Sequence, residues 1–193
     1  MNFIQTYDRA VSEGDCDRLI SIFENSPNKG EGYIMLDGKP TIDHSFKQSI
    51  ELPDCRFSKS NVMSATIKVP LEKCIVEYVE KYSILRDGVS KWNIVDAYTF
   101  KKYETEKDGY KAWHCEHAYA KGYDGLEGAS RRILAWMFYL NNAKSGTEFM
   151  QYPTVRARMG RCVIWPAGWT HVHRGVIPNK GLKYIITGWV SLV

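Results

Sequence analysis

The sequence lacks the features of three common protein classes. Its five cysteines are scattered, odd in number and without a C-x-x-C pair, which argues against a disulfide framework or a zinc ribbon and favours a reducing compartment. No stretch approaches the roughly 18 apolar residues of a membrane helix. The first residues show no basic segment followed by an apolar run, as a signal peptide would. We therefore expect a cytoplasmic protein without a membrane partner.

Runs of one charge and internal repeats are also missing. The net charge of +4 is mildly basic, but no cluster of basic residues gives a specific nucleic-acid signal. No low-complexity segment or linker divides the 193 residues. We therefore expect a single domain over residues 1–193, which assembles as a monomer or a homodimer.

Two helical patterns occupy the otherwise irregular N-terminal part, residues 1–90. Ser12 or Asp15 can cap a first helix, which Pro27 ends. Pro70 suits the first position of a second helix, which Asp87-Gly88 ends. Its apolar residues recur at steps of three and four and predict a core-facing stripe: Leu71, Cys74, Ile75, Tyr78, Val79 and Tyr82.

From Trp92 to Val193 the chain changes to short β-rich segments separated by turn residues. Candidate strands are 92–103, 110–117, 131–140, 147–152, 161–166, 169–174 and 183–192. Segment 131–140 is apolar on both faces, as expected for a central strand covered on both sides. The pattern predicts an α+β, mainly β fold: a double-stranded β-helix, or jelly roll, over residues 92–193, with two or more N-terminal helices packed on one sheet.

Two histidines and a lysine suggest a site near the C-terminus. His171 and His173 would face the same way if 169–174 is a strand. Lys183 lies among apolar residues of the next strand, where a cation needs an anionic partner. These residues suggest a metal site beside an acid-binding pocket.

A second group of metal-ligating residues is His114-x-Glu116. On a strand both side chains would project from one face, and a distant histidine would complete a set of two histidines and one carboxylate. Such a set suits non-haem Fe(II) with open coordination positions. An alternative is a cupin-type metalloprotein, which would use the His171-x-His173 pair with another histidine on the same jelly roll.

The segments from about residue 92 onward resemble the 2-oxoglutarate and Fe(II)-dependent dioxygenases, and within them the prolyl 4-hydroxylase-like branch. The matching pieces, in order, are Tyr103, His114-Cys115-Glu116, Tyr139-Leu140-Asn141, Ser145-Gly146-Thr147-Glu148-Phe149, Gly160-Arg161-Cys162-Val163-Ile164-Trp165-Pro166, His173, Lys183 and Trp189. Their order and spacing agree with the family throughout, which is more specific than any single motif.

The resemblance implies a set of roles and cofactors. His114, Glu116 and His173 would hold Fe(II), with His173 chosen over His171 because only His173 has the family's ten-residue spacing to the lysine. Lys183 would pair with the far carboxylate of 2-oxoglutarate, assisted by the Tyr139 hydroxyl. Tyr103 would line the same pocket near the iron-chelating end of 2-oxoglutarate. O2 would be the oxidant, with ascorbate as an optional further cofactor.

The resemblance also implies the reaction, which is hydroxylation of a C–H bond with release of succinate and CO2. A procollagen-proline 4-dioxygenase-like activity on a peptidyl proline is the favoured reading, within a wider range of peptide, protein or small-molecule substrates. Segments 104–112 and 118–130 would select the substrate.

One residue departs from the family pattern, because the carboxylate ligand is normally aspartate and this chain has Glu116. The extra methylene moves the carboxylate outward, so the backbone must retreat or the geometry must change. His117 is a possible substitute ligand. A non-catalytic jelly-roll binding module is therefore a further alternative.

Overall fold

The computed structural model describes residues 2–36, 39–58, 62–104, 106–117, 131–178 and 181–193. Its elements, in chain order, are β1 (Gln5–Tyr7), α1 (Glu13–Asn25), β2 (Gly30–Glu31), β3 (Ile34–Leu36), β4 (Lys39–Thr41), β5 (Lys47–Gln48), β6 (Ile50–Arg56), α2 (Val62–Lys81), α3 (Ile84–Asp87), β7 (Trp92–Tyr103), β8 (Gly109–Tyr110), β9 (Arg132–Tyr139), β10 (Gly146–Phe149), β11 (Val155–Arg156), β12 (Cys162–Pro166), the 3₁₀ turn η2 (Trp169–His171), β13 (His173–Val176) and β14 (Lys183–Leu192). The segment 118–130, expected to select the substrate, lies outside the described residues.

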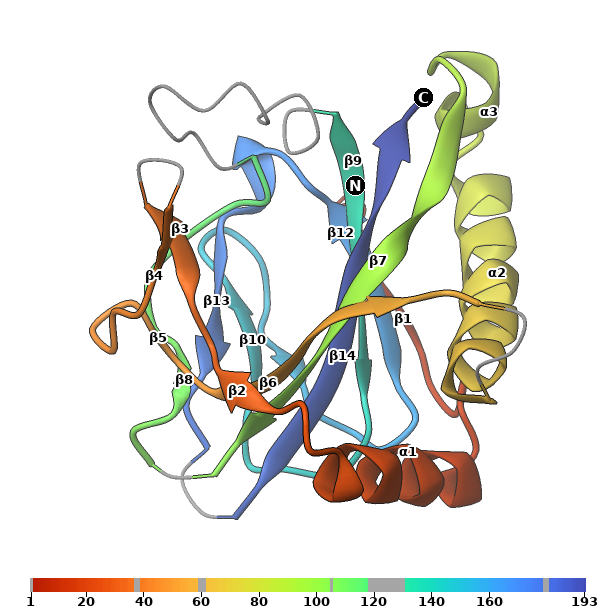
Figure 1. Ribbon diagram of the computed structural model, residues 1–193. Helices are drawn as coiled ribbons and strands as arrows, with labels where there is room; N and C mark the ends of the chain where they lie inside the picture. The colour runs from red at the N-terminus through yellow and green to blue at the C-terminus, as the bar shows by residue number, and fades with distance from the viewer. Residues whose placement is uncertain (1, 37–38, 59–61, 105, 118–130, 179–180) are drawn as a thin grey trace.

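A seven-stranded sheet forms the centre of the molecule, in the order β1-β12-β9-β14-β7-β6-β2 (Figure 1). A smaller sheet, β11-β10-β13, and the two-stranded pairs β3-β4 and β5-β8 lie beside it. The long central strands pair antiparallel, with Lys183 of β14 opposite Tyr103 of β7 and Ile185 opposite Tyr139 of β9. This is the predicted jelly-roll arrangement, so the expected fold class is confirmed.

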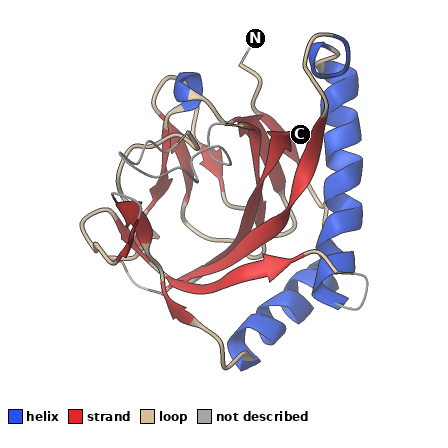
Figure 2. Ribbon diagram, turned by 45° about the horizontal axis from the view of Figure 1, so that its top comes forward, coloured by secondary structure: helices blue, strands red, loops and turns tan. Residues whose placement is uncertain are grey.

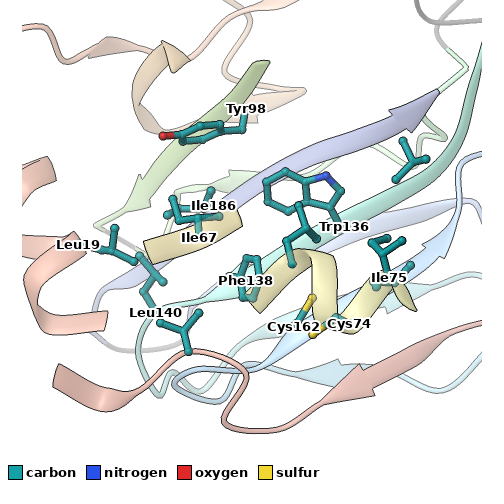
Figure 3. Close-up of a cluster of buried hydrophobic side chains, with 14 of the residues drawn as sticks. Leu19, Ile67, Cys74, Ile75, Tyr98, Trp136, Phe138, Leu140, Cys162 and Ile186 are labelled. Atoms are coloured by element: carbon teal, nitrogen blue, oxygen red, sulfur yellow. The ribbon is translucent and has the colours of Figure 1, made fainter. Parts of the chain in front are cut away.

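The helices α1 and α2 lie on one side of the large sheet (Figure 2). Because side chains alternate along a strand, each central strand sends one set of residues under the helices and the other set to the opposite side. Trp136 and Phe138 of β9 and Ile186 of β14 meet Ile67 and other residues of α2 in the buried core (Figure 3). We call the side under the helices the helix face and the opposite side the cavity face.

Helix α1 begins where the sequence indicated. The Ser12 side chain accepts a hydrogen bond from the main-chain N–H of Asp15, which satisfies one free donor of the first turn. Cys16, Leu19 and Phe23 form the buried stripe. Of the two predicted caps, Ser12 is therefore the one used.

Helix α2 corrects the predicted start of the second helix. It begins at Val62 rather than at Pro70, so the proline lies inside the helix. Proline cannot donate the main-chain hydrogen bond of an interior position. Met63 and Ile67, in the turns before it, are buried against the core, and this packing outweighs the local cost of the proline.

Two predicted strands are also corrected. Of the predicted segment 110–117, only Tyr110 lies in a strand, which is β8 (Gly109–Tyr110). The rest is loop, with an isolated bridge between His114 and His173. Segment 169–174 begins as η2 and becomes a strand only at His173. The premise that His171 and His173 share a strand was therefore wrong.

The described part of the chain contains no helix with the length and apolar character needed to cross a bilayer.

Candidate metal centre

The cavity face of the large sheet forms one wall of a cavity of about 620 Å³. Alternate residues of β14 line it, namely Lys183, Ile185, Thr187 and Trp189. Their neighbours Tyr184, Ile186 and Val190 belong to the helix-face core. Strand β14 is therefore apolar on both faces because one face packs under the helices and the other lines the cavity.

Three metal-ligating side chains meet in this cavity: His114, Glu116 and His173. Their ligand atoms all lie within 4.8 Å of one another, and Nε2 of His173 lies 3.3 Å from Oε1 of Glu116. Main-chain hydrogen bonds fix the two segments together, from His114 N–H to the His173 carbonyl (3.0 Å) and from His173 N–H to the His114 carbonyl (2.9 Å). The predicted triad is thus brought together by a bridge rather than by a full strand.

Hydrogen bonds set the tautomers of both histidines. Nδ1 of His114 lies 3.0 Å from the Ala112 carbonyl, and Nδ1 of His173 lies 2.9 Å from the His171 carbonyl. A carbonyl oxygen only accepts, so Nδ1 carries the proton in each ring and donates it. The lone pair of each Nε2 is left for a metal, which is the usual arrangement of metal-ligating histidines.

The electrostatics of the triad favour a cation. Burial, together with the nearby His173, lowers the pKa of His114 to about 4, so that this ring is neutral at pH 7. Burial alone would raise the pKa of Glu116, but the adjacent imidazoles of His173 and His114 and the hydrogen bond from Trp189 outweigh it and hold the pKa well below its usual range. A neutral imidazole beside an ionised carboxylate is the protonation state that divalent metal binding requires.

Two further side chains hold Glu116, one at its carboxylate and one at its main-chain carbonyl. Nε1–H of Trp189 donates to Oε2 of Glu116 at 2.6 Å. The Arg132 guanidinium stacks on the Trp189 ring, with 3.7 Å between its Cζ and the ring centroid, and donates to the Glu116 carbonyl. Since Oε2 is occupied by Trp189, Oε1 is the oxygen that faces His173.

Lys183 lies in the same cavity and is 2% exposed. Its ammonium donates to the Val176 carbonyl at 3.1 Å and lies 4.5 Å from the ring centroid of Tyr103. No carboxylate within the described residues forms an ion pair with it. Gly175 leaves room beside it, since a Cβ there would lie 3.6 Å from the ammonium nitrogen. This space and the missing counter-charge fit an anionic ligand.

The two predicted tyrosines differ in position. Tyr103 lines the cavity next to Lys183, and burial raises its pKa well above the usual value, so that it stays a neutral hydrogen-bond donor. Tyr139 is buried behind the cavity wall, and its hydroxyl is 2.6 Å from Oγ1 of Thr147. Thr147, which sequence reasoning did not select, lines the cavity instead.

His171 and His117 lie apart from the triad. Nε2 of His171 hydrogen-bonds to the Asn2 carbonyl (2.8 Å), and its ring stacks on Tyr152. Only the main-chain carbonyl of His171 contributes to the site, through His173. Nε2 of His117 donates to the Arg132 carbonyl. The cupin-type arrangement, which needs the His171 ring, is not the one observed.

Two aromatic side chains of the site were missed by sequence reasoning. Tyr110 stacks on His114 with ring centroids 3.7 Å apart. Trp165 packs edge-on against His173, and its Nε1–H is a buried donor without a hydrogen-bond partner in the described structure. Trp165 could have been found from its strand, because Val163 and Trp165 alternate onto the cavity face. For Tyr110 the signal was the predicted strand 110–117, on which it would share a face with His114 and Glu116.

The family model described as "2OG-Fe(II) oxygenase superfamily" matches residues 98–191. That range contains the whole triad and Lys183. Residues 98–191 therefore carry the sequence pattern of this superfamily. The chain is therefore a 2-oxoglutarate-dependent dioxygenase by class, as the sequence predicted, and its cofactors are Fe(II) and 2-oxoglutarate. The nitrogen and carboxylate donors of the triad fit such an ion.

Solved structures with a similar fold include prolyl hydroxylases. The viral collagen prolyl hydroxylase of Paramecium Bursaria Chlorella virus-1, in its 2OG complex, has a TM-score of 0.68 at 16% identity, covering 100% of this chain and 97% of that one. A Pseudomonas putida prolyl-4-hydroxylase has a TM-score of 0.67 at 10% identity, with coverage of 100% and 94%.

A third similar structure is the Trichoplax adhaerens prolyl hydroxylase in complex with a peptide fragment of the hypoxia inducible factor oxygen degradation domain. It has a TM-score of 0.72 at 13% identity, covering 99% of this chain and 84% of that one. At these identities the likenesses establish the fold. Compared by sequence, none of the curated proteins matches the chain.

The buried Lys183 predicts a specific pH dependence of stability. Burial lowers its pKa from 10.5 to about 7. Between about pH 7 and pH 10 the unfolded chain therefore binds a proton that the folded chain releases, so the free energy of unfolding rises with pH across this window. We expect Lys183→Met to flatten this rise in urea denaturation of the metal-free protein.

Lys73→Met, on the exposed face of α2, is the matched control and should keep the slope of the parent protein. Equal slopes for the two variants would show that Lys183 is solvated in the folded state.

Proposed function

We propose that this dioxygenase hydroxylates a peptidyl proline, with His114, Glu116 and His173 as the iron ligands and Lys183 as the anchor of 2-oxoglutarate. The observation that carries the proposal is one cavity with two contrasting ends. One end has a metal-ligating triad with its Nε2 atoms free, and the other has a buried ammonium without a carboxylate partner in the described residues. A dicarboxylate that binds a metal at one end and a cation at the other satisfies both.

Bound Fe(II), with 2-oxoglutarate and O2, supplies the oxidation: one oxygen atom enters the substrate C–H bond and the other enters succinate, with release of CO2. The side chains bind, orient and exclude water. Lys183 pairs with the far carboxylate, and this pair is strong because Lys183 is almost completely buried. The Tyr103 hydroxyl donates to the same co-substrate, and Tyr139 supports it indirectly by holding Thr147.

The glutamate in place of the family's aspartate is compatible with this assignment. Oε1 of Glu116 reaches within 3.3 Å of the His173 Nε2 atom, so the longer side chain still delivers a carboxylate oxygen to the site. Trp189 and Arg132 restrain the extra rotatable bond that glutamate adds. His117 is not required as a substitute ligand.

The mouth of the cavity supports a peptide as the substrate. Four apolar side chains both line the cavity and are more than a third exposed: Tyr33, Met35, Leu36 and Phe46. Exposed apolar residues at a cavity mouth mark a surface that binds a partner. The choice of proline rests on the similar prolyl hydroxylases, one of which binds a peptide fragment.

Turnover with a proline-containing peptide tests the proposed reaction. With Fe(II), 2-oxoglutarate and O2, the protein should form one succinate for each peptide that gains the mass of one oxygen atom. His173→Ala should abolish both products because it removes a ligand. His171→Ala should retain most of the turnover, since the His171 ring lies outside the cavity.

Comparable losses in the two variants would favour the cupin-type alternative. Succinate without any hydroxylated peptide would leave the co-substrate assignment standing and remove the proline.

The hydrogen bond from Trp189 to Glu116 gives a second prediction, on metal affinity. Trp189→Phe removes the donor and leaves an aromatic ring for Arg132, so the carboxylate loses its orientation. Loss of such an outer hydrogen bond typically weakens metal binding roughly 10- to 100-fold. Mn(II) titration followed by electron paramagnetic resonance measures it, with Trp169→Phe, at a 77% exposed position, as the control. An affinity within about twofold of the parent protein would mean that Trp189 does not orient the ligand.

A further inference from the structure

A second group of charged residues lines the cavity away from the metal triad. It consists of Lys47 on β5, Glu51 on β6 and Lys101 on β7. The Lys47 ammonium lies 2.9 Å from Oε1 of Glu51, and the Lys101 ammonium lies 3.7 Å from the same oxygen. Ser49 also donates to this oxygen. We call these residues the Lys47–Glu51–Lys101 cluster.

The cluster contains more positive than negative charge. The side chains of Lys47 and Glu51 are 5% and 6% exposed, and that of Lys101 is 14% exposed. Lys47 is well satisfied, because it also donates to the Tyr33 carbonyl. Lys101 shares Glu51 with Lys47 at a longer distance and has no other carboxylate partner in the described part of the chain. A largely buried cation without its own counter-charge is costly unless a ligand supplies one.

The net charge of the cavity also favours an anionic ligand. Fe(II) with the Glu116 carboxylate leaves one positive charge, and doubly charged 2-oxoglutarate with Lys183 leaves one negative charge, so the proposed cofactors and their ligands are neutral together. Among the described residues, the other ionised side chains that line the cavity are Lys47, Lys101, Arg132 and Glu51. They leave two positive charges, which the proposed reaction does not use.

Strand register gives Lys101 different direct partners from those of Lys183. On β7, Lys101 is two residues before Tyr103 and therefore on the same cavity face. It lies opposite Ile185 of β14 on one side and opposite Glu51 of β6 on the other. The residue of β14 that pairs directly with Lys101 is therefore Ile185 rather than Lys183, and the charged residue that pairs with it is Glu51 of β6.

We propose that Lys101, supported by Lys47, binds an anionic group of the hydroxylated substrate, and that this group is the carboxylate of an acidic residue beside the target proline. This inference rests on the proposed function for the location of the reacting carbon. It adds a specificity determinant, because an ammonium in a poorly hydrated cavity discriminates strongly between a carboxylate and a neutral amide.

Peptide binding to the complete chain, loaded with Mn(II) and 2-oxoglutarate, tests this proposal. The probes are three fluorescein-labelled peptides with one proline and blocked ends, which differ only in having Glu, Gln or Lys on either side of the proline. Measured by fluorescence anisotropy, the affinity of the Glu peptide should be at least about tenfold higher than that of the Gln peptide. The Lys peptide should have the lowest affinity of the three.

Lys101→Met should remove the preference for Glu over Gln, while Glu51 keeps Lys47 as its partner and the fold is retained. Lys101→Arg should restore the preference, which a purely structural role of Lys101 would not require. Lys73→Met makes the same charge change on α2 and should leave the preference unchanged.

Equal affinities for the Glu and Gln peptides, in a protein that still forms succinate from 2-oxoglutarate, would overturn the anionic subsite alone. The cluster would then be a structural ion network between β5, β6 and β7. If none of the three peptides binds, the subsite and the peptide substrate are both wrong. If 2-oxoglutarate itself does not bind, the proposed function fails first.

Discussion

The alternation of side chains across the seven-stranded sheet is the constraint on which the site depends. Each central strand must satisfy an apolar core under α1 and α2 on one face and a polar cavity on the other. On β14 this places Ile186 under the helices and Lys183 in the cavity. Because a shift of one residue would exchange the two faces, burial of the helix-face core fixes the register, and the register fixes the positions of Lys183, Tyr103 and Lys101.

Much of the fold and of the triad could be predicted from the sequence, because those features depend on local patterns. The stripe from Leu71 to Tyr82 predicted a core-facing helix, and the apolar segment 131–140 predicted the central strand β9. His114-x-Glu116, together with the family resemblance that implied His173 and Lys183 by their spacing, predicted residues that the structure brings into one cavity. Their roles as ligands of Fe(II) and 2-oxoglutarate are proposals, which the His173→Ala variant and the metal titrations test.

The remaining features depend on contacts between distant segments. Pro70 favoured a helix start, but burial of Ile67 carries α2 through it. No local sequence pattern predicted that η2 would turn the His171 ring away from His173. The partners of Glu116 come from β9 and β14, and Glu51 meets Lys101 only through the pairing of β6 with β7. Lys101, like Trp165, carried a local signal, since it alternates with Tyr103.

The central claim is that His114, Glu116 and His173 hold Fe(II) together with 2-oxoglutarate. Anaerobic titration of the protein with Fe(II) and 2-oxoglutarate tests it most directly, because a 2-oxo acid chelated to Fe(II) has a visible charge-transfer band. The band should appear only with both ligands, saturate at one iron per chain and be lost in His173→Ala. The absence of a band at saturating Fe(II) and 2-oxoglutarate would contradict the account.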